Sequence, residues 1–497
     1  MKKEIILEIF QKDTSKKYFV YPNSFLSDKR NLTYFIVKNS NNKYLGIAGD
    51  KEGMNNLTFL NPASEDINLG DGKNIIRLYC MDDSNLEKIK VIFPFLLPTP
   101  IGLSSSFGFG DRLGIATPAH IRVIGNNRNI SPVFAQQSVR ELEKTGRDYR
   151  EVIDDVIWGV FQEGFEGKWG ADADHLKNEE QLRKSVKEGF TMYTLDPSDL
   201  IQEQALYIRT NIIKNKHDFD SLYFRKVKKR YVGKKYKIGN YTLKFNEDRA
   251  IRIAIVYKKA LDFILSMYRI LKENLYLFDL EISFDETNII TSPEAHFFIA
   301  NEMQESGVEF DSLALRFPGI FEKGIDYKGD VLEFSESVNI HRCISKKIGC
   351  YKLSLHSGSD KFSIYPAFAR YTESLFHIKT SGTTWLEAMR VIAICNEELF
   401  RELYQIAIGR FEENRKDYKI SLDCSVLPKT LFDIKNEELP KLIDRRETRQ
   451  LFHISYGSFL EKRRKEIYET IFKNEEKYYE LVANCLGRHL SLLEISE

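Results

Sequence analysis

The sequence predicts an α/β fold: a (β/α)8 barrel of the TIM type with a small N-terminal α+β cap and a helical C-terminal extension. From about residue 102, short apolar runs alternate with longer amphipathic stretches, which is the pattern of parallel strands joined by crossover helices. There are eight such runs, the number of strands in a barrel of this type. An open, doubly wound sheet is the alternative, but no GxGxxG motif or P-loop follows the first run.

The expected strands are bounded by turn residues, and the stretches between them have helical periodicity. The strands are expected at 113–118 (LGIATP), 132–137 (PVFAQQ), 170–175 (GADADH), 191–196 (TMYTLD), 279–286 (DLEISFDE), 312–317 (SLALRF), 351–356 (YKLSLH) and 375–380 (LFHIKT). Helices are expected at 138–164, 179–189, 248–274, 292–306 and 385–396.

Changes in composition and residue pattern along the chain predict three domains. Residues 1–100 alternate short mixed strands with Asn, Gly and Asp turns, which predicts the cap. Residues 101–416 form the expected catalytic barrel, with an insertion at about 198–247 that contains a basic and aromatic run. We expect this insertion to cover the barrel mouth or to mediate self-association. Residues 417–497 are rich in Glu, Lys and Arg and predict the helical extension.

The composition narrows the class of partner. Lysine plus arginine (73) and aspartate plus glutamate (72) nearly cancel, so the chain lacks the general positive field that recruits nucleic acid. Prolines interrupt the longest apolar stretch, VIFPFLLPTPIGL, which argues against a membrane helix. The six cysteines are scattered, and acidic residues interrupt the apolar residues near the start. We therefore expect a cytoplasmic protein whose partner is a small molecule or a second copy of itself.

Polar side chains lie at the ends of the expected strands. Two successive strands end near a histidine, His356 and His377, and Lys379 follows on the same face as His377. In GADADH, Asp174 stands beside His175, so that one could be a ligand and the other an acid or base. Each of these polar side chains, taken alone, has an ordinary structural explanation, such as helix capping. Together they predict a divalent metal site of mixed nitrogen and oxygen ligands, with Zn, Mn, Fe, Co and Ni all compatible.

A buried carboxylate and several cations add to this set. Alternation along 279–286 places Glu281 on the polar face of its strand, where a carboxylate is costly unless it serves a site or a cation. We prefer Glu281 as an acid or base, and the roles of Asp285 and Glu286 stay open. Four further side chains suit a substrate that has hydroxyls and a carboxylate: Gln137, Arg316, Lys361 and Lys379.

Several long strings resemble the tagaturonate epimerase family (tagaturonate/fructuronate epimerases) of bacterial hexuronate catabolism. They include FGDRLGIATPAH, FAQQSVRELEKTGR, GADADHLK, EKGIDYKGD, KLSLHSGSDKFSIYPAF and FHIKTSGTTWLEA. The resemblance covers the expected barrel, from about residue 104 to 414. It implies a divalent-metal-dependent enzyme that interconverts D-tagaturonate and D-fructuronate, two ketouronates.

These two ketouronates differ at a carbinol carbon one position removed from the carbon beside the ketone. Removing an acidic α-proton does not invert that carbon, so we expect a retro-aldol and aldol sequence, with transient oxidation and reduction as the rival. On this hypothesis His175, His356 and His377 bind the metal, Asp174 is the base and Glu281 is the partner acid. A metal-dependent sugar isomerase or aldolase acting on a related sugar acid is the alternative enzyme. A non-catalytic uronate-binding protein is the alternative outside catalysis.

Overall fold

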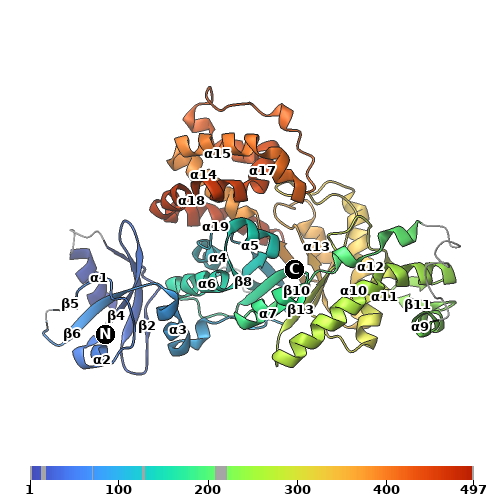
Figure 1. The fold of residues 1–497 in the computed structure, drawn as a ribbon, viewed down its shortest axis with the longest axis horizontal. Coiled ribbons are helices and arrows are strands. Elements are labelled where there is room, and N and C mark those ends of the chain that lie inside the picture. The colour runs from blue at the N-terminus through green and yellow to red at the C-terminus, as the bar shows by residue number, and fades with distance from the viewer. Residues whose placement is uncertain (1–2, 13–17, 70, 126–128, 208–220, 495–497) are drawn as a thin grey trace.

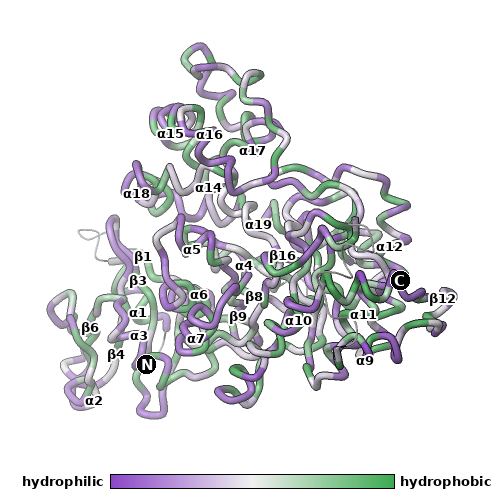
Figure 2. The backbone as a smooth tube through the Cα atoms, turned by 45° about the vertical axis from the view of Figure 1, so that its right-hand side comes forward, coloured by the Kyte–Doolittle hydropathy of each residue, from purple (hydrophilic) through white to green (hydrophobic). Residues whose placement is uncertain are grey.

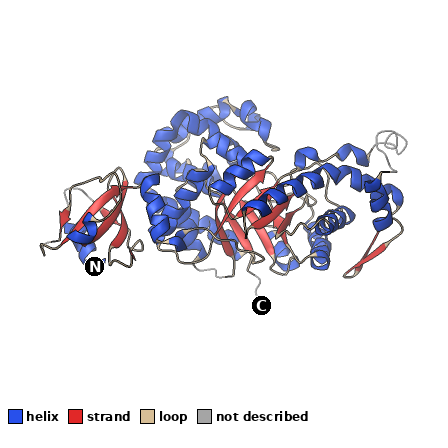
Figure 3. Cartoon of the chain, turned by 60° about the horizontal axis from the view of Figure 1, so that its bottom comes forward, coloured by secondary structure: helices blue, strands red, loops and turns tan. Residues whose placement is uncertain are grey.

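The computed structural model describes residues 3–12, 18–69, 71–125, 129–207 and 221–494. At its centre, eight parallel strands close in the order β10-β13-β14-β15-β16-β7-β8-β9, with helices around them (Figure 1 and Figure 3). The strands are β7 (Ser106–Phe109), β8 (Ser131–Ser138), β9 (Gly170–Leu176), β10 (Met192–Leu195), β13 (Asp279–Ser283), β14 (Ser312–Ala314), β15 (Lys352–Leu355) and β16 (Phe376–Thr380). The predicted fold class is confirmed.

Alternation along the strands separates the barrel interior from its helical coat. In β15, Leu353 and Leu355 join the hydrophobic core. Lys352 lies on the opposite face, and its Nζ is 3.2 Å from Ser106 Oγ on β7. Because β15 and β7 are not neighbours in the sheet, that bond spans the interior. Polar side chains therefore face inward and apolar ones outward, as expected for a barrel covered by helices.

The first predicted strand, at 113–118, is wrong. The barrel strand is β7, which ends at Phe109, and helix α4 (Thr117–Ile124) begins within the predicted segment. The Asp111 carboxylate accepts backbone hydrogen bonds from Leu113, Gly114 and Ala116, which folds this segment into a turn. The sequence of β7, SFGF, is short and lacks β-branched residues, so the more apolar LGIATP gave the stronger signal.

The helices expected between the strands form, and Figure 2 shows hydrophilic and hydrophobic residues alternating along α10 and α11. The stretch 138–164 is divided at Gly146, whose left-handed backbone (φ 64°) ends one helix before Asp148 caps the next. The helices of the barrel layer include α5 (Val139–Thr145), α6 (Tyr149–Glu163), α7 (Glu179–Lys187), α10 (Glu247–Asn274), α11 (Pro293–Glu305), α12 (Val331–Ile348), α13 (Tyr365–Tyr371) and α14 (Thr383–Cys395).

The N-terminal part is an antiparallel sheet at one end of the molecule (Figure 1). One face, with Phe35 and Val37, packs under α1 (Lys3–Lys12) in a small separate core, and the other face joins the main core. The strands are β1 (Phe19–Val20), β2 (Leu26–Ser27), β3 (Thr33–Lys38), β4 (Lys43–Asp50), β5 (Ile67–Asn68) and β6 (Asn74–Cys80), with α2 (Lys51–Asn55) and α3 (Asp83–Ile92) beside them.

The insertion forms α9 (Leu222–Tyr231) and a hairpin of β11 (Lys235–Ile238) and β12 (Tyr241–Lys244), at the far end from the N-terminal sheet (Figure 3). Buried Tyr231 packs against Phe298 of α11 with ring centroids 5.0 Å apart and the ring planes tilted by 46°, so this aromatic residue of the basic run serves packing. In the described part of the chain, no helix is both long enough and apolar enough to cross a membrane.

The C-terminal helices lie over one side of the barrel (Figure 1). They are α15 (Glu397–Gly409), α16 (Phe411–Asn414), α17 (Arg446–Ile454), α18 (Tyr456–Lys473) and α19 (Glu475–Ser491). The last of them packs against α4 and α14. Between α16 and α17, Asp417 and Tyr418 reach a cavity at the carboxyl ends of the barrel strands. This extension therefore contributes directly to the mouth of the barrel.

Candidate active site at the barrel mouth

The end of β9 turns two successive side chains into one cavity. Neighbouring residues of a strand normally point to opposite faces, yet both Asp174 and His175 line the cavity. His175 adopts a left-handed backbone (φ 56°), and the pairing of β9 with β10 shifts register here. Such a conformation costs a non-glycine residue about 1–3 kcal/mol and is concentrated at functional sites. The strain delivers the carboxylate and the imidazole together.

Asp196 fixes the orientation of the His175 ring. Asp196 Oδ2 lies 3.0 Å from Nδ1 of His175 and is held in turn at the end of β10, where Oδ1 accepts from the Ser198 amide. Nδ1 therefore carries the proton that is donated to Asp196, which leaves Nε2 toward the cavity, 3.7 Å from Asp174 Oδ1. A carboxylate that accepts from one ring nitrogen while the other faces the metal is the usual arrangement around a metal-binding histidine.

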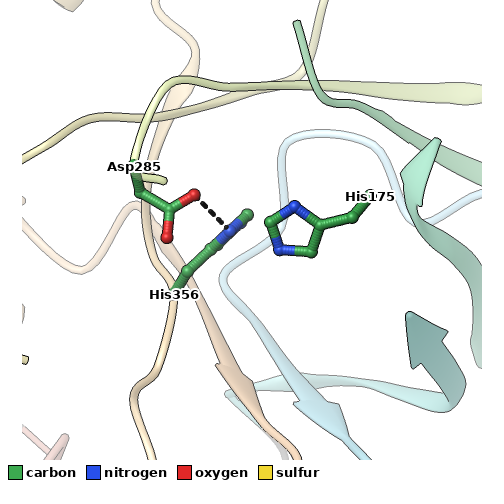
Figure 4. Close-up of side chains that lie close together, drawn as sticks. All are labelled: His175, Asp285 and His356. Atoms are coloured by element: carbon green, nitrogen blue, oxygen red, sulfur yellow. Dashed lines mark ion pairs between the residues drawn. The ribbon is translucent and has the colours of Figure 1, made fainter. Parts of the chain in front are cut away.

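His356, directly after β15, faces His175 across the cavity with ring centroids 5.0 Å apart. Its Nε2 lies 2.6 Å from Glu281 Oε1, and its Nδ1 lies 3.0 Å from Asp285 Oδ1. His175, Asp285 and His356 each place one donor atom within 4.8 Å of the others, and all three point toward a common centre (Figure 4). A second such group, His175, Asp196 and Glu286, shares His175 with the first.

The protonation state of His356 decides what lies between its ring and Asp285. When both ring nitrogens carry protons, Nε2 pairs with Glu281 and Nδ1 with Asp285; when Nε2 alone carries a proton, Nδ1 presents a lone pair to the carboxylate of Asp285. Two electron-rich atoms at 3.0 Å need a proton or a cation between them. Burial would lower the pKa of His356, but Asp285 and Glu281 outweigh it and raise the pKa to about 9. One imidazole nitrogen from each histidine and one carboxylate oxygen suit a divalent cation.

Below this group, Lys379 of β16 is buried among three carboxylates. Its Nζ lies 2.6 Å from Asp172, 2.7 Å from Asp174 and 2.8 Å from Glu281. Burial would lower the pKa of Lys379, yet these carboxylates raise it well above the usual value. Burial, together with the charges of Asp174 and Glu281, raises the pKa of Asp172 to about 6 in spite of Lys379. Negative charge therefore exceeds positive charge at this site, which favours an added cation.

The cavity above has a volume of about 350 Å³, large enough for a six-carbon sugar acid. A neighbouring cavity of about 420 Å³ shares Asp285, Glu286, His356 and Ser357 with it. Cationic side chains are frequent around both, and Tyr418 lies at their common edge. The mouth is thus strongly polar, with carboxylates and imidazoles at the floor and cations at the rim.

The remaining predicted site residues lie apart from this group. His377, one position into β16, is fully buried and bonds Ser106 Oγ through Nδ1 at 2.9 Å, and it belongs to neither donor group found in the described chain. Burial lowers its pKa to about 3. Arg316 lines the neighbouring cavity. Lys361 is buried and donates to three backbone carbonyl oxygens.

Two differences concern residues next to the predicted ones. Gln137 donates to Glu141 at 3.3 Å, whereas Gln136 lines the cavity, because a register irregularity in β8 falls between Val133 and Ala135. Glu281 is fully buried and lies outside the lining of the cavity, whereas Asp285 lines it. Sequence reasoning missed Lys323, which lines both cavities; it lies in a loop without the periodicity that would have identified it.

Comparison with known proteins covers nearly the whole chain. The tagaturonate epimerase family profile matches residues 21–493. A protein of Thermotoga maritima described as tagaturonate/fructuronate epimerase is 43% identical over 493 residues, which is 99% of this chain and 100% of that protein. Crystal structures of a fructuronate-tagaturonate epimerase from Cohnella laeviribosi, one native and one with glycerol, superpose with a TM-score of 0.90 at 36% identity and cover 98% of each chain. The chain therefore belongs to the tagaturonate epimerase family.

Proposed function

We propose that this epimerase interconverts D-tagaturonate and D-fructuronate with a divalent cation held by His175, His356 and Asp285. The substrates are those named for the Thermotoga maritima and Cohnella laeviribosi relatives, which match the chain almost end to end. The observation that carries the metal assignment is the convergence of one donor atom each from His175, His356 and Asp285, all within 4.8 Å of one another. Asp285 takes the place that we expected for His377, whose Nδ1 bonds Ser106.

The donor set fits a divalent cation of the zinc, manganese, iron, cobalt or nickel group. A bound cation would supply Lewis acidity toward the ketone oxygen of the substrate and so offset negative charge that develops there. The three proposed ligands come from the carboxyl ends of β9, β13 and β15, where barrel enzymes place their chemistry. Asp196 and Glu281 hold the two imidazoles in orientation.

Asp174 is the proposed base. It lines the cavity, and Lys379 Nζ is 2.7 Å from Oδ1. Burial would raise the pKa of Asp174, but His175 and Lys379 outweigh it and hold the pKa below its usual value. The carboxylate is therefore ionised and able to accept a proton from a substrate hydroxyl. Its low basicity suits a group that must also return that proton.

The proposed inversion is a retro-aldol cleavage followed by an aldol addition. Asp174 accepts the proton of the hydroxyl on the carbon to be inverted. The O–H electron pair becomes the new C=O bond as the adjoining C–C bond breaks, leaving an aldehyde and an enediolate. The aldehyde turns over, the C–C bond re-forms on its other face, and Asp174 returns the proton, so that atoms and charge balance.

Glu281 acts in this scheme as a positioning residue, in place of the partner acid expected from sequence. Its Oε1 accepts from His356 and Lys379 and its Oε2 accepts from Ser312 at 2.6 Å. Burial would raise the pKa of Glu281, but Lys379 and His356 hold it well below the usual value. A carboxylate so engaged stays ionised, so it holds its neighbours in place and has no proton to donate.

NMR of purified protein incubated with D-tagaturonate tests the proposal. After chelator treatment we expect no conversion, and each divalent metal added back in turn identifies the one that restores D-fructuronate formation. Full activity after exhaustive chelation would contradict the metal assignment while leaving the epimerase assignment intact. Accumulation of a free aldehyde would indicate an aldolase, and binding without conversion under any metal would indicate a uronate-binding protein.

A further inference from the structure

Lys323 lies in the loop after β14 and reaches the barrel mouth beside the end of β15. Its Nζ donates to Ser357 Oγ at 2.8 Å, and Ser357 directly follows His356. The side chain is half-buried and lines both cavities. It therefore places a positive charge beside the proposed ligand group and faces the space that a substrate would fill.

The other cations that line the main cavity already have carboxylate partners. The pairs are Arg112 with Glu141 at 2.8 Å, Arg140 with Glu286 at 3.1 Å, Lys144 with Asp417 at 2.7 Å, Lys177 with Asp199 at 2.9 Å and Lys379 with Asp172 at 2.6 Å. Among the described residues, no carboxylate oxygen lies within the 4.0 Å that defines an ion pair from Lys323. A half-buried ammonium group without an anion is costly, and a bound carboxylate would remove that cost.

Side chains from two other segments hold the loop that carries Lys323. Lys361 Nζ donates to the carbonyl oxygens of Glu322 and Ile325 at 3.0 and 2.6 Å. Arg449 Nε donates to the Gly324 oxygen at 2.9 Å. Consequently the backbone on both sides of Lys323 is fixed, and the bond from Nζ to Ser357 Oγ at 2.8 Å restrains the side chain, so less entropy is lost when its ammonium group binds an anion.

We propose that Lys323 binds the carboxylate of the sugar acid and gives the site its preference for ketouronates over uncharged ketoses. This inference rests on the proposed function, because it requires a sugar-acid substrate. Ser357, which holds the Nζ, adds a hydroxyl that can donate to the same carboxylate. Lys361, expected from sequence to contact substrate, acts through the loop and positions Lys323.

The experiment compares D-tagaturonate with D-tagatose, which carries a CH2OH group in place of the carboxylate. Dissociation constants for both are measured by calorimetry for the wild type, Lys323→Met and Lys323→Arg. Loss of one charge-assisted contact predicts that Lys323→Met weakens D-tagaturonate binding about 10- to 100-fold and leaves D-tagatose binding within about twofold. Lys323→Arg, which keeps the charge, restores most of the difference.

The control is Lys328→Met, in the same loop. Lys328 lines neither cavity, and its side chain is 34% exposed, so we expect unchanged binding of both sugars. Equal weakening of both sugars by Lys323→Met would show that the side chain only supports the loop, and no weakening of either would exclude it from the site. A separate assay follows the conversion of D-tagaturonate to D-fructuronate by the wild type. This assay tests the proposed epimerisation independently of the role of Lys323.

Discussion

Replacing Glu281 with glutamine distinguishes a positioning role from a proton-donating one. The change removes the negative charge and keeps the size of the side chain. Glu281 accepts two charge-assisted bonds, from His356 at 2.6 Å and Lys379 at 2.8 Å. Hydrogen bonds to charged groups contribute about 1.5–3 kcal/mol and neutral ones about 0.5–1.5, so each loses about 1 kcal/mol. The total of about 2 kcal/mol corresponds to a roughly 30-fold weakening.

If Glu281 orients His356, we expect Glu281→Gln to weaken metal binding by this factor and kcat to recover at saturating metal. Metal affinity is measured by competition with a chromophoric chelator. Ser312→Ala is the matched control, because it removes the bond to Oε2 at 2.6 Å without changing a charge. We expect a weakening of about fivefold from a loss of about 1 kcal/mol. Unchanged metal affinity with a large fall in kcat at saturating metal would contradict the positioning role and indicate that Glu281 acts as an acid.

The remaining predictions concern the ligand group, the base, acid stability and the metal. Asp285→Asn should weaken metal binding at least tenfold by calorimetry, whereas Glu286→Gln, at the exposed rim, should change it little; equal effects would contradict the ligand assignment. Asp174→Asn should lower kcat about 10²- to 10⁴-fold, and near wild-type kcat would exclude Asp174 as the base. Burial lowers the pKa of His341, which contacts His296, to about 4. As the pH falls from about 6.5 to 4, His341 is therefore protonated in the unfolded chain but not in the folded one. The free energy of unfolding falls by up to about 3 kcal/mol over this range. Urea titrations across that window should show a smaller pH dependence for His341→Gln, and identical slopes would contradict the assignment. Chelation should abolish turnover while circular dichroism keeps its native spectrum, since the donors lie at the mouth and outside the hydrophobic core.

Opposite charges lie next to each other at the barrel mouth, which explains why the fold tolerates so many buried ionisable groups there. Lys379 compensates part of the charge of Asp172, Asp174 and Glu281, and a protonated or metal-bound His356 compensates Asp285. Removing Lys379 would leave three carboxylates with one fewer cation in a buried space, the kind of change that is strongly destabilising. The same residue thus supports both the barrel interior and the ionised state of the proposed base.

Local patterns in the sequence predict the barrel and most of the residues that line its mouth. Periodicity predicts seven of the eight strands because each is an apolar run bounded by turn residues, and the parallel arrangement then brings the strand ends together. It also identified His175, His356 and Asp174, since each lies at the end of such a run. Strands and the residues at their ends can be predicted in this way because periodicity depends only on residues close together in the chain.

Which of those side chains meet depends on the three-dimensional packing of the chain. The left-handed backbone of His175 and the register shift beside it overturn simple alternation, and neither can be deduced from residue types. The structure brings Asp285 to His356 and leaves His377 deeper in the barrel, because side-chain position depends on depth along a tilted strand as well as on its face. Lys323 and Tyr418 reach the mouth from a loop and from the C-terminal extension, through contacts between residues distant in the chain that no local pattern encodes.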